Sequence, residues 1–356
     1  MNSRLKKFSK SLSCHDAYLV VNKTDIRYLV GFPVSDSWLL FAGGKPYIIT
    51  DGRYKDEIRA SVGAGILVKE FKTSRVDEVF KIVDHKGLLR LGFDERHVPV
   101  SLFKELRKAC SKQMKLIALN GLVERSRAIK DNEEISIILK CLEVNRELFA
   151  YLQQLLKPGM TERELLYKAE NFIKARGAAF SFDPIIASGP NSAYPHAVIT
   201  NRKIKDNDIV LVDIGIEIDG YKSDLTRIFL SDKIAKLVTD IYKVVAAAQE
   251  EAIAHIRANV PVAEIDLAAR KSLKVKKLDR FFTHSTGHGV GLDIHECPRL
   301  SLKSNEVLQK GMVVTVEPGV YLPQQFGIRI EDMVLVTETG CKVLSRGSKV
   351  EPPFHF

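Results

Sequence analysis

The sequence predicts a chain of the α/β class with two domains. Short apolar runs typical of strands alternate with stretches of helical periodicity, a pattern typical of sheets covered by helices. The length of 356 residues suggests two domains at roughly 100–200 residues each. A hydrophobic fraction of 45% and a charged fraction of 28% are typical of a globular chain and argue against disorder.

The first third is predicted to form a smaller α/β domain. Apolar runs indicate strands over residues 17–21, 36–41, 46–50 and 88–93. The middle two flank Gly43-Gly44, a pair typical of a hairpin turn. Helices are expected over residues 76–86 and 102–110, so that helices cover the faces of a sheet.

A polar, charged stretch, VERSRAIKDNEE at residues 123–134, predicts the domain boundary. We expect an N-terminal domain over residues 1–124 and a larger domain over 125–356. The larger domain begins with an amphipathic helix, because apolar residues recur mostly every three or four positions between residues 135 and 155.

Turn and cap signals divide the rest of the larger domain. Pro158-Gly159 ends the first helix, and Thr161 with Glu164 forms a capping-box pattern for the next. A long helix is expected over residues 234–256, and a shorter one after Pro261.

Two pairs of strands are predicted between and after these helices. Residues 209–218 and 221–230 flank Asp219-Gly220, a strong hairpin signal. Residues 312–317 and 327–336 form the second pair, joined by a loop that begins at Pro318-Gly319. Helices followed by a carboxylate-bearing strand pair therefore occur twice after residue 130.

Composition limits the possible partners and compartment. Lys and Arg total 54 against 44 Asp and Glu, a net charge of +10, which raises the question of nucleic acid. No basic stripe interleaved with aromatic residues supports that role, and no apolar run reaches the roughly 18–20 residues that span a bilayer. We therefore expect neither nucleic-acid nor membrane binding.

The cysteines and the N-terminus favour a cytoplasmic protein. The five cysteines are scattered and show no Cys-x-x-Cys spacing, which disfavours a disulfide framework and a thiolate zinc site. Residues 1–13 contain lysines without an apolar core behind them, which disfavours a secretory signal. The cysteines are Cys14, Cys110, Cys141, Cys297 and Cys341.

Two aspartates lie in an otherwise apolar hairpin. Asp213 is in IVLVDIGI and Asp224 is in YKSDLTR. A two-residue turn places Asp213 opposite Thr226, with Asp224 as its diagonal neighbour at about 7–8 Å on the same face. Two carboxylates on one buried face repel each other unless a cation lies between them.

More acids and histidines follow in the second half of this domain. Glu317 ends VVTVEPG, and Glu331 lies in GIRIEDM two residues after Arg329, on the same face. Three glycines disfavour a helix in the window HSTGHGVGLDIHE and allow close approach of the backbone to a bound group. The window's histidines are His284, His288 and His295; His196 lies apart, in AYPHAV.

One histidine with four carboxylates is a mainly oxygen ligand set. It suits manganese, iron or cobalt, with zinc possible, and could bridge two ions. Two such ions can hold a hydroxide between them and clamp a tetrahedral intermediate. Further histidines nearby would donate to a substrate carbonyl and to the developing oxyanion.

Ordinary structural explanations exist for each residue alone. A single Asp in a strand is often a bulge or edge residue, and a lone His is more often a hydrogen-bonded structural residue. His255, near Glu250, Glu251 and Arg257, is interpreted as surface. The structural explanation would have to hold separately for all four strand carboxylates, so we prefer a shared site.

The order Asp213, Asp224, His288, Glu317, Glu331 resembles the pita-bread metallopeptidases, which include Xaa-Pro aminopeptidase, Xaa-Pro dipeptidase and methionine aminopeptidase. The window at residues 284–296 resembles the proline-peptidase signature. Residues 22–54 resemble the creatinase-type N-terminal domain of the proline-specific branch, and residues 123–135 its linker. The resemblance implies a pita-bread catalytic domain behind a creatinase-like domain.

The resemblance implies a role for each metal ligand. Asp213 would chelate one metal ion, and Asp224 and Glu331 would bridge both. His288 and Glu317 would hold the second ion. Glu317 would also accept a proton from the bridging water. The two divalent ions would most often be Mn²⁺, with Co²⁺, Zn²⁺ or Fe²⁺ as alternatives.

The resemblance also implies roles for four neighbours. His196 and His295 would contact the substrate carbonyl and the intermediate. His284 would line the site, and Arg329 would orient the carboxylates. The N-terminal domain of this branch commonly helps to form dimers, which implies a homodimer.

The leading functional prediction is an Xaa-Pro aminopeptidase that acts on peptides with proline at the second position. The nearest alternative is Xaa-Pro dipeptidase, which would need a cation for the free C-terminal carboxylate; the sequence does not identify that cation. Methionine aminopeptidase would not need the N-terminal domain. Creatine hydrolysis shares the fold without the metal ligands. A non-catalytic binding module would suit the net charge but has no reason to retain the ligand set.

Overall fold

The chain divides into two compact units, residues 1–127 and 128–356, each described below by itself. The computed structural model describes residues 3–12, 16–63, 65–346 and 353–356; Cys14 lies outside them. The predicted domain boundary between residues 124 and 125 falls inside helix α6, Leu122–Ala128. Among the described residues, no helix is both long and apolar enough to cross a membrane.

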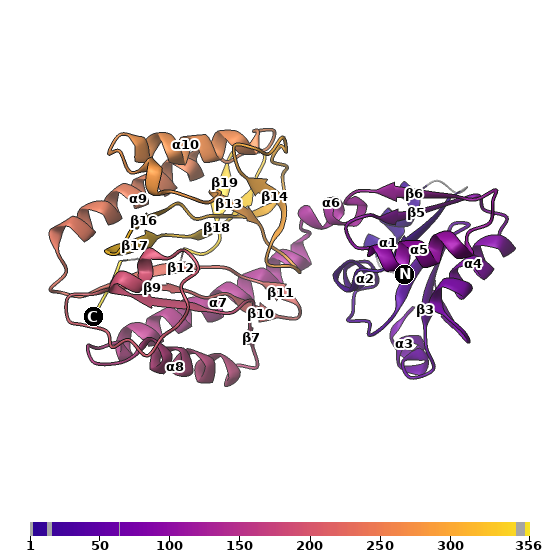
Figure 1. Cartoon of the computed structure of the whole chain (residues 1–356), viewed down its shortest axis with the longest axis horizontal. Coiled ribbons are helices and arrows are strands. Elements are labelled where there is room, and N and C mark those ends of the chain that lie inside the picture. The colour runs from indigo at the N-terminus through magenta and orange to yellow at the C-terminus, as the bar shows by residue number, and fades with distance from the viewer. Residues whose placement is uncertain (1–2, 13–15, 64, 347–352) are drawn as a thin grey trace. The chain divides into compact units, whose positions relative to one another are not determined.

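Unit 1 is a six-stranded mixed sheet with helices packed against it (Figure 1). The strand order is β4-β3-β2-β1-β5-β6. The strands are β1 Ala17–Val20, β2 Trp38–Ala42, β3 Lys45–Thr50, β4 Leu67–Glu70, β5 Arg90–Asp94 and β6 Lys115–Leu119. The helices are α1 Ser3–Ser11, α2 Lys23–Val30, α3 Lys55–Ser61, α4 Arg75–His85, α5 Val100–Ala109 and α6.

The predicted hairpin of unit 1 is confirmed. β2 and β3 pair antiparallel, and Gly43 and Gly44 both have positive φ, which glycine adopts without steric cost. The sequence patterns missed β4 and β6, the two edge strands of the sheet, whose residues are exposed or half-buried.

Unit 2 places its strands between two pairs of helices (Figure 1). Helices α7 Asn132–Leu155 and α8 Glu162–Lys174 lie along one side, and α9 Lys236–Ala254 and α10 Val262–Lys274 along the other. The capping box predicted at Thr161 and Glu164 is present, and a second one at Asp131 and Glu134 begins α7. Two short 3₁₀ helices are η1 Gly189–Ala193 and η2 Asp279–Phe281.

The strands of unit 2 form four small sheets, ordered β20-β12-β9-β8, β11-β10-β7, β14-β13-β15-β18-β19 and β16-β17. The first-half strands are β7 Ala179–Phe180, β8 Ile185–Ser188, β9 Ile209–Asp213, β10 Ile216–Ile218, β11 Tyr221–Lys222 and β12 Thr226–Leu230. The later ones are β13 Gly287–Gly289, β14 Glu296–Leu300, β15 Val313–Val316, β16 Gly319–Leu322, β17 Phe326–Arg329, β18 Asp332–Val336, β19 Cys341–Val343 and β20 Phe354–His355.

The predicted register of the first hairpin is confirmed, because Asp213 pairs with Thr226. The two long strands are nevertheless broken, since β9 gives way to β10 and β11 to β12. Close packing accounts for the break. A Cβ at Gly215 would lie 1.9 Å from Ser181 Oγ and 2.1 Å from the carbonyl oxygen of Ser223, so the break contains a position that only glycine can occupy.

The second strand pair differs from its prediction in two ways. The expected strand over 327–336 is two strands, β17 and β18, interrupted at Ile330 and Glu331. The expected loop after Pro318-Gly319 is largely strand β16, which pairs antiparallel with β17. Gly319 lies opposite Arg329 in that pair. Pro318-Gly319 therefore precedes a hairpin, and the interruption at Glu331 frees its side chain from the alternation of the strand.

Candidate metal centre

Four of the five predicted metal ligands come from ends and interruptions of strands in unit 2, and the fifth lies within a strand whose pairing shifts register beside it. Asp213 ends β9, Asp224 lies between β11 and β12, and His288 is in β13. Glu317 follows β15, and Glu331 lies between β17 and β18. At such positions a side chain can leave the regular pleat and turn toward a common point.

The structure brings these side chains together. His288 Nε2 lies 3.6 Å from Asp224 Oδ2 and 3.4 Å from Glu317 Oε1. Ligand atoms of Asp224, His288 and Glu331 all lie within 4.8 Å of one another. Asp213 is close enough that its charge raises the pKa of Asp224, Glu317 and Glu331.

The cluster holds more negative charge than its single arginine compensates. The pKa of Asp224 is raised well above its usual range, mainly by burial and then by the charges of Asp213 and Glu317. Burial, followed by Asp224, has the same effect on Glu331. Burial raises the pKa of Glu317 to about 8, although Arg329 opposes the shift. A cation among these groups would reverse the shifts.

Two carboxylates each have one oxygen that is fixed and one without a partner. Arg329 Nη2 donates to Asp213 Oδ2 at 2.6 Å, and Thr226 Oγ1 donates to Glu331 Oε2 at 2.8 Å. Asp213 Oδ1 and Glu331 Oε1 are buried and have no hydrogen-bond partner among the described residues. Buried oxygens of this kind need a donor or a cation. These residues fit divalent cations.

His288 is arranged to accept a metal through Nε2. Its Nδ1 lies 3.0 Å from the carbonyl oxygen of Gly289, which only accepts, so Nδ1 carries the proton and Nε2 keeps its lone pair. Burial and the neighbouring His295 lower the pKa of His288 to about 4. The imidazole is therefore neutral at neutral pH, the form that binds metal.

Arg329 links the cluster to its surroundings. Besides Asp213, its guanidinium donates to Thr226 Oγ1 at 3.0 Å, to Tyr321 Oη at 2.6 Å and to the carbonyl oxygen of Pro195 at 3.2 Å. The Arg329 side chain is buried. Burial alone would lower its pKa, but Tyr321 and the nearby carboxylates outweigh this effect, so the pKa of Arg329 is raised overall. The guanidinium thus remains charged and fixes the orientation of Asp213.

His284 reaches this network through Tyr321. His284 Nδ1 lies 2.9 Å from the carbonyl oxygen of Ser285, so Nδ1 donates. Its Nε2 then accepts from Tyr321 Oη at 2.9 Å. Burial lowers the pKa of His284 to about 4 and raises the pKa of Tyr321 to about 12. A neutral imidazole, a phenol and Arg329 therefore form one directed chain of hydrogen bonds.

The other two predicted histidines lie beside the cluster. The His295 ring is 4.4 Å from that of His288, edge to face. Burial is the largest cause of the lowered pKa of His295, and the charge of His196 is the second. His196 is exposed, and it also contributes to the lowered pKa of His284. Asp213 opposes the shift of the pKa of His295, so this ring lies close enough to the cluster to be affected by the charge of a predicted ligand.

A buried glutamate fixes the segment that carries His196. Glu162, the first residue of α8, is fully buried. Its Oε1 accepts from the backbone N–H of Ser188 at 2.7 Å, and its Oε2 accepts from that of Thr200 at 2.9 Å. Asn191 Nδ2 donates to the same carboxylate at 2.9 Å. The segment from 188 to 200 is therefore held at both ends.

Two glycines of the histidine window allow neighbouring backbone to pack closely against it. Close approach of a bound group to this window stays a prediction. A Cβ at Gly287 would lie 2.0 Å from the carbonyl oxygen of Thr315, and one at Gly289 would lie 2.2 Å from that of Cys297. The reason is that β13 lies between β14 and β15. Nearby, a buried ion pair of Lys130 with Glu296 at 3.0 Å supports the same window.

Sequence analysis did not single out Thr226 as a functional residue and missed Tyr321. The register placed Thr226 opposite Asp213, which was a usable signal for a residue on the ligand face. Tyr321 follows Glu317 by four positions in a segment predicted as loop, and nothing in the sequence placed it against His284. His255, interpreted as surface, is exposed and lies beside Glu251.

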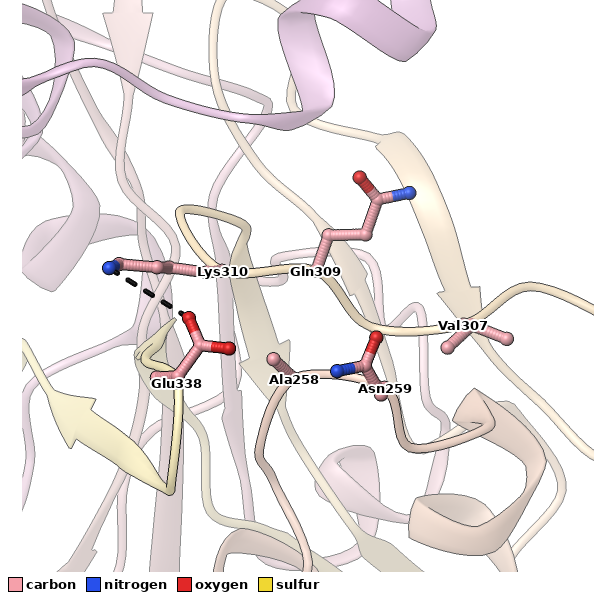
Figure 2. A pocket seen from close by; sticks show the side chains of 6 residues that line it. All are labelled: Ala258, Asn259, Val307, Gln309, Lys310 and Glu338. Atoms are coloured by element: carbon pink, nitrogen blue, oxygen red, sulfur yellow. Dashed lines mark ion pairs between the residues drawn. The ribbon is translucent and has the colours of Figure 1, made fainter.

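Two other features are distinct from this centre. In unit 1, ligand atoms of Asp25, His97 and Glu124 cluster, but Arg127 and Arg96 already pair with the two acids. In unit 2, a pocket of about 480 Å³ contains none of the predicted site residues (Figure 2). Its lining is Ala258, Asn259, Val307, Gln309, Lys310 and Glu338.

Fold and site together define a two-domain chain whose second domain carries a carboxylate–histidine metal centre. Residues 4–129 match the creatinase/prolidase N-terminal domain, and residues 136–338 match metallopeptidase family M24. The chain belongs to metallopeptidase family M24 and is a hydrolase of that family.

Relatives cover nearly the whole chain. An Xaa-Pro dipeptidase from Pyrococcus horikoshii is 33% identical, over 97% of this chain and 97% of that protein. The solved structure of an Xaa-Pro dipeptidase from Bacillus anthracis is 33% identical with a TM-score of 0.92, covering 98% of both chains. That of an X-Pro aminopeptidase from Thermotoga maritima is 32% identical with a TM-score of 0.87, covering 96% of this chain and 98% of that one.

Proposed function

We propose that the chain hydrolyses the bond between an N-terminal residue and a following proline, as an Xaa-Pro aminopeptidase. The observation that carries the proposal is the set of buried carboxylates converging on His288, with the bare oxygens of Asp213 and Glu331. The names of relatives in the same family support proline as the second residue. Proline lacks a backbone N–H and constrains its neighbours, which favours a dedicated site.

We infer the ligand roles from the family resemblance. Asp213 would hold one divalent ion, His288 and Glu317 would hold a second, and Asp224 and Glu331 would be shared between the two. When bound, the ions supply an activated water and an electrophile for the substrate carbonyl. Arg329 donates to Oδ2 of Asp213 and so orients this carboxylate, whose Oδ1 has no hydrogen-bond partner among the described residues.

The remaining residues handle protons and orientation. Glu317 is the proposed proton acceptor for the attacking water. His196 and His295 donate to the substrate carbonyl oxygen and to the developing oxyanion. His284, which burial keeps neutral and Tyr321 orients through a hydrogen bond, lines the site.

The metal, assembly and compartment are part of the proposal. Four carboxylates with one imidazole favour Mn²⁺ over softer ions. The N-terminal domain supports a homodimer, as the resemblance implies. The four described cysteines are free, which agrees with a reducing cytoplasm. Metal analysis of the purified protein and light scattering test the first two points.

A second candidate function is Xaa-Pro dipeptidase, and Arg299 favours it. This residue lies opposite His288 in the pairing of β13 with β14. It is exposed, and no hydrogen bond or ion pair of its guanidinium occurs among the described residues. Burial is the largest cause of the lowered pKa values of His288 and His295, and the charge of Arg299 contributes to both shifts. A guanidinium close to these histidines and free of protein partners among the described residues suits the C-terminal carboxylate of a dipeptide.

Hydrolysis of Xaa-Pro dipeptides and Xaa-Pro-Xaa tripeptides, with and without added Mn²⁺, tests both candidates. Turnover of the tripeptide supports the aminopeptidase, and turnover of dipeptides alone refutes it. If Arg299 binds the free carboxylate, Arg299→Met should raise KM for the dipeptide at least tenfold. KM for the tripeptide should change less, because its carboxylate lies one residue farther away.

A further inference from the structure

Two buried carboxamides in unit 2 contact the backbone beside the predicted ligands. Asn145 is in α7 and Gln249 is in α9, and each is the fourteenth residue of its helix. Asn145 is 0% exposed and Gln249 is 2% exposed. Because neither side chain is charged or belongs to the predicted site, their role must follow from what the amides bind.

Gln249 joins the two segments that carry the glutamates. Its Nε2 donates to the carbonyl oxygen of Val316 at 3.0 Å and to that of Ile330 at 3.2 Å. These two residues immediately precede Glu317 and Glu331. Both partners are carbonyl oxygens, which only accept, so the NH₂ group of the amide must face them. One side chain therefore fixes the points from which both glutamates leave the backbone.

Asn145 has the same relation to the aspartates. Its Nδ2 donates to the carbonyl oxygen of Ile214 at 2.9 Å, and its Oδ1 accepts from Ser223 Oγ. Ile214 directly follows Asp213, and Ser223 directly precedes Asp224. The amide from α7 thus joins the two segments that carry Asp213 and Asp224, as the amide from α9 does for the glutamates.

The interruptions of the strands explain why these contacts are needed. Ile214 lies between β9 and β10, and Ile330 lies between β17 and β18. At an interruption the ladder of backbone hydrogen bonds stops, and a buried carbonyl left without a partner is costly. The same interruptions release the ligand side chains from the pleat. An amide donated from the helix behind satisfies the carbonyl and restricts its motion.

We propose that Gln249 and Asn145 are positioning residues for the metal centre, one for each pair of carboxylate ligands. Gln249 sets the separation of Glu317 and Glu331, and Asn145 sets that of Asp213 and Asp224. Both act through the backbone and contact neither metal nor substrate. The inference rests on the proposed metal-dependent function.

Gln249→Met tests the inference, because methionine is similar in length but donates nothing. Titration of the metal-free variant with Co²⁺ should show an affinity ten- to a hundredfold below that of the unmodified protein. The visible spectrum of bound Co²⁺ should change, because the ligand geometry changes. With saturating metal, kcat should fall while KM changes less than twofold, because the amide does not touch the substrate.

Val245→Ala is the matched control. Val245 is fully buried one turn earlier on the same helix, so this variant loosens α9 without removing an amide. It should lower the melting temperature and leave Co²⁺ affinity and spectrum unchanged. A Gln249→Met variant that behaves in the same way would overturn the inference.

A second variant covers the case in which Gln249→Met does not fold. Gln249→Asn retains a donor amide on a shorter side chain, and its Co²⁺ affinity should lie between those of Gln249→Met and the unmodified protein. Affinity and spectrum equal to those of the unmodified protein would again overturn the inference. Cobalt binding without Xaa-Pro hydrolysis would refute the proposed function alone.

Discussion

The metal-free protein should lose stability as the pH rises from 6.5 to 8, and Glu317 should account for a defined part of the loss. The pKa of Glu317 is about 8 in the folded chain, chiefly because of burial, against an ordinary value of 4.5. Between these values the folded state holds a proton that the unfolded state has released. Stability therefore falls with increasing pH by about 1.4 kcal/mol per pH unit for each such group.

The histidines determine the pH range of the measurement. The pKa values of His284 and His288 are lowered from 6.5 to about 4 in the folded state, so stability contributed by these residues is lost as the pH falls below 6.5. Above pH 6.5 both are mostly neutral in either state, and the carboxylates dominate. Over the 1.5 units up to pH 8, Glu317 alone contributes a loss of about 2 kcal/mol. Asp224 and Glu331 act in the same direction.

Urea denaturation in the presence of a chelator, followed by far-ultraviolet circular dichroism, measures this effect. Glu317→Gln removes the titrating group, and its loss of stability over the same range should be smaller by about 2 kcal/mol. Metal-loaded protein should not show the loss, because the cations hold the carboxylates ionised in the folded state. Equal losses in the metal-free parent and Glu317→Gln, or stability that rises with pH in the metal-free parent, would refute the reasoning.

Two substitutions test the centre more directly. Glu331→Gln or His288→Ala should abolish hydrolysis of Xaa-Pro peptides and leave the circular dichroism spectrum unchanged; full activity in either variant would contradict the ligand assignment. Tyr321→Phe removes one hydrogen bond to a charged guanidinium, worth roughly 1.5–3 kcal/mol, and a weaker one to His284. Its kcat/KM should fall roughly 10- to 150-fold with Mn²⁺ affinity retained, and a fall of less than threefold would show that the hydrogen-bonded chain is not needed.

The sequence predicts those metal ligands well that are charged residues within an otherwise apolar strand. Asp213 and Asp224 stand out because an acid inside an apolar strand is costly, and the turn at Asp219-Gly220 specifies the register without further information. Thr226 opposite Asp213 follows from the same local rule. Such signals need only the period of a strand and the length of a turn.

Features set by tertiary packing could not be predicted in this way. The interruption at Glu331 depends on contacts with Thr226 and α9, which join residues more than eighty positions apart. Tyr321 lies in a segment whose Pro-Gly start suggested a loop, and its partner His284 precedes it by 37 residues. The glycines at 287 and 289 reveal crowding by β14 and β15 only once the sheet is assembled.

The net charge of +10 does not predict the charge at the centre. Three buried carboxylates, the half-buried Glu317 and Arg329 lie together there, and the pKa values of three of the acids are raised. Repulsion among these neighbouring carboxylates affects their pKa values more than the distant basic surface does, because the interior screens charge less than water does. A bound cation would therefore be held by the local excess of carboxylates and would in turn stabilise the folded chain. Metal content, rather than overall charge, should then decide how stable unit 2 is at neutral pH.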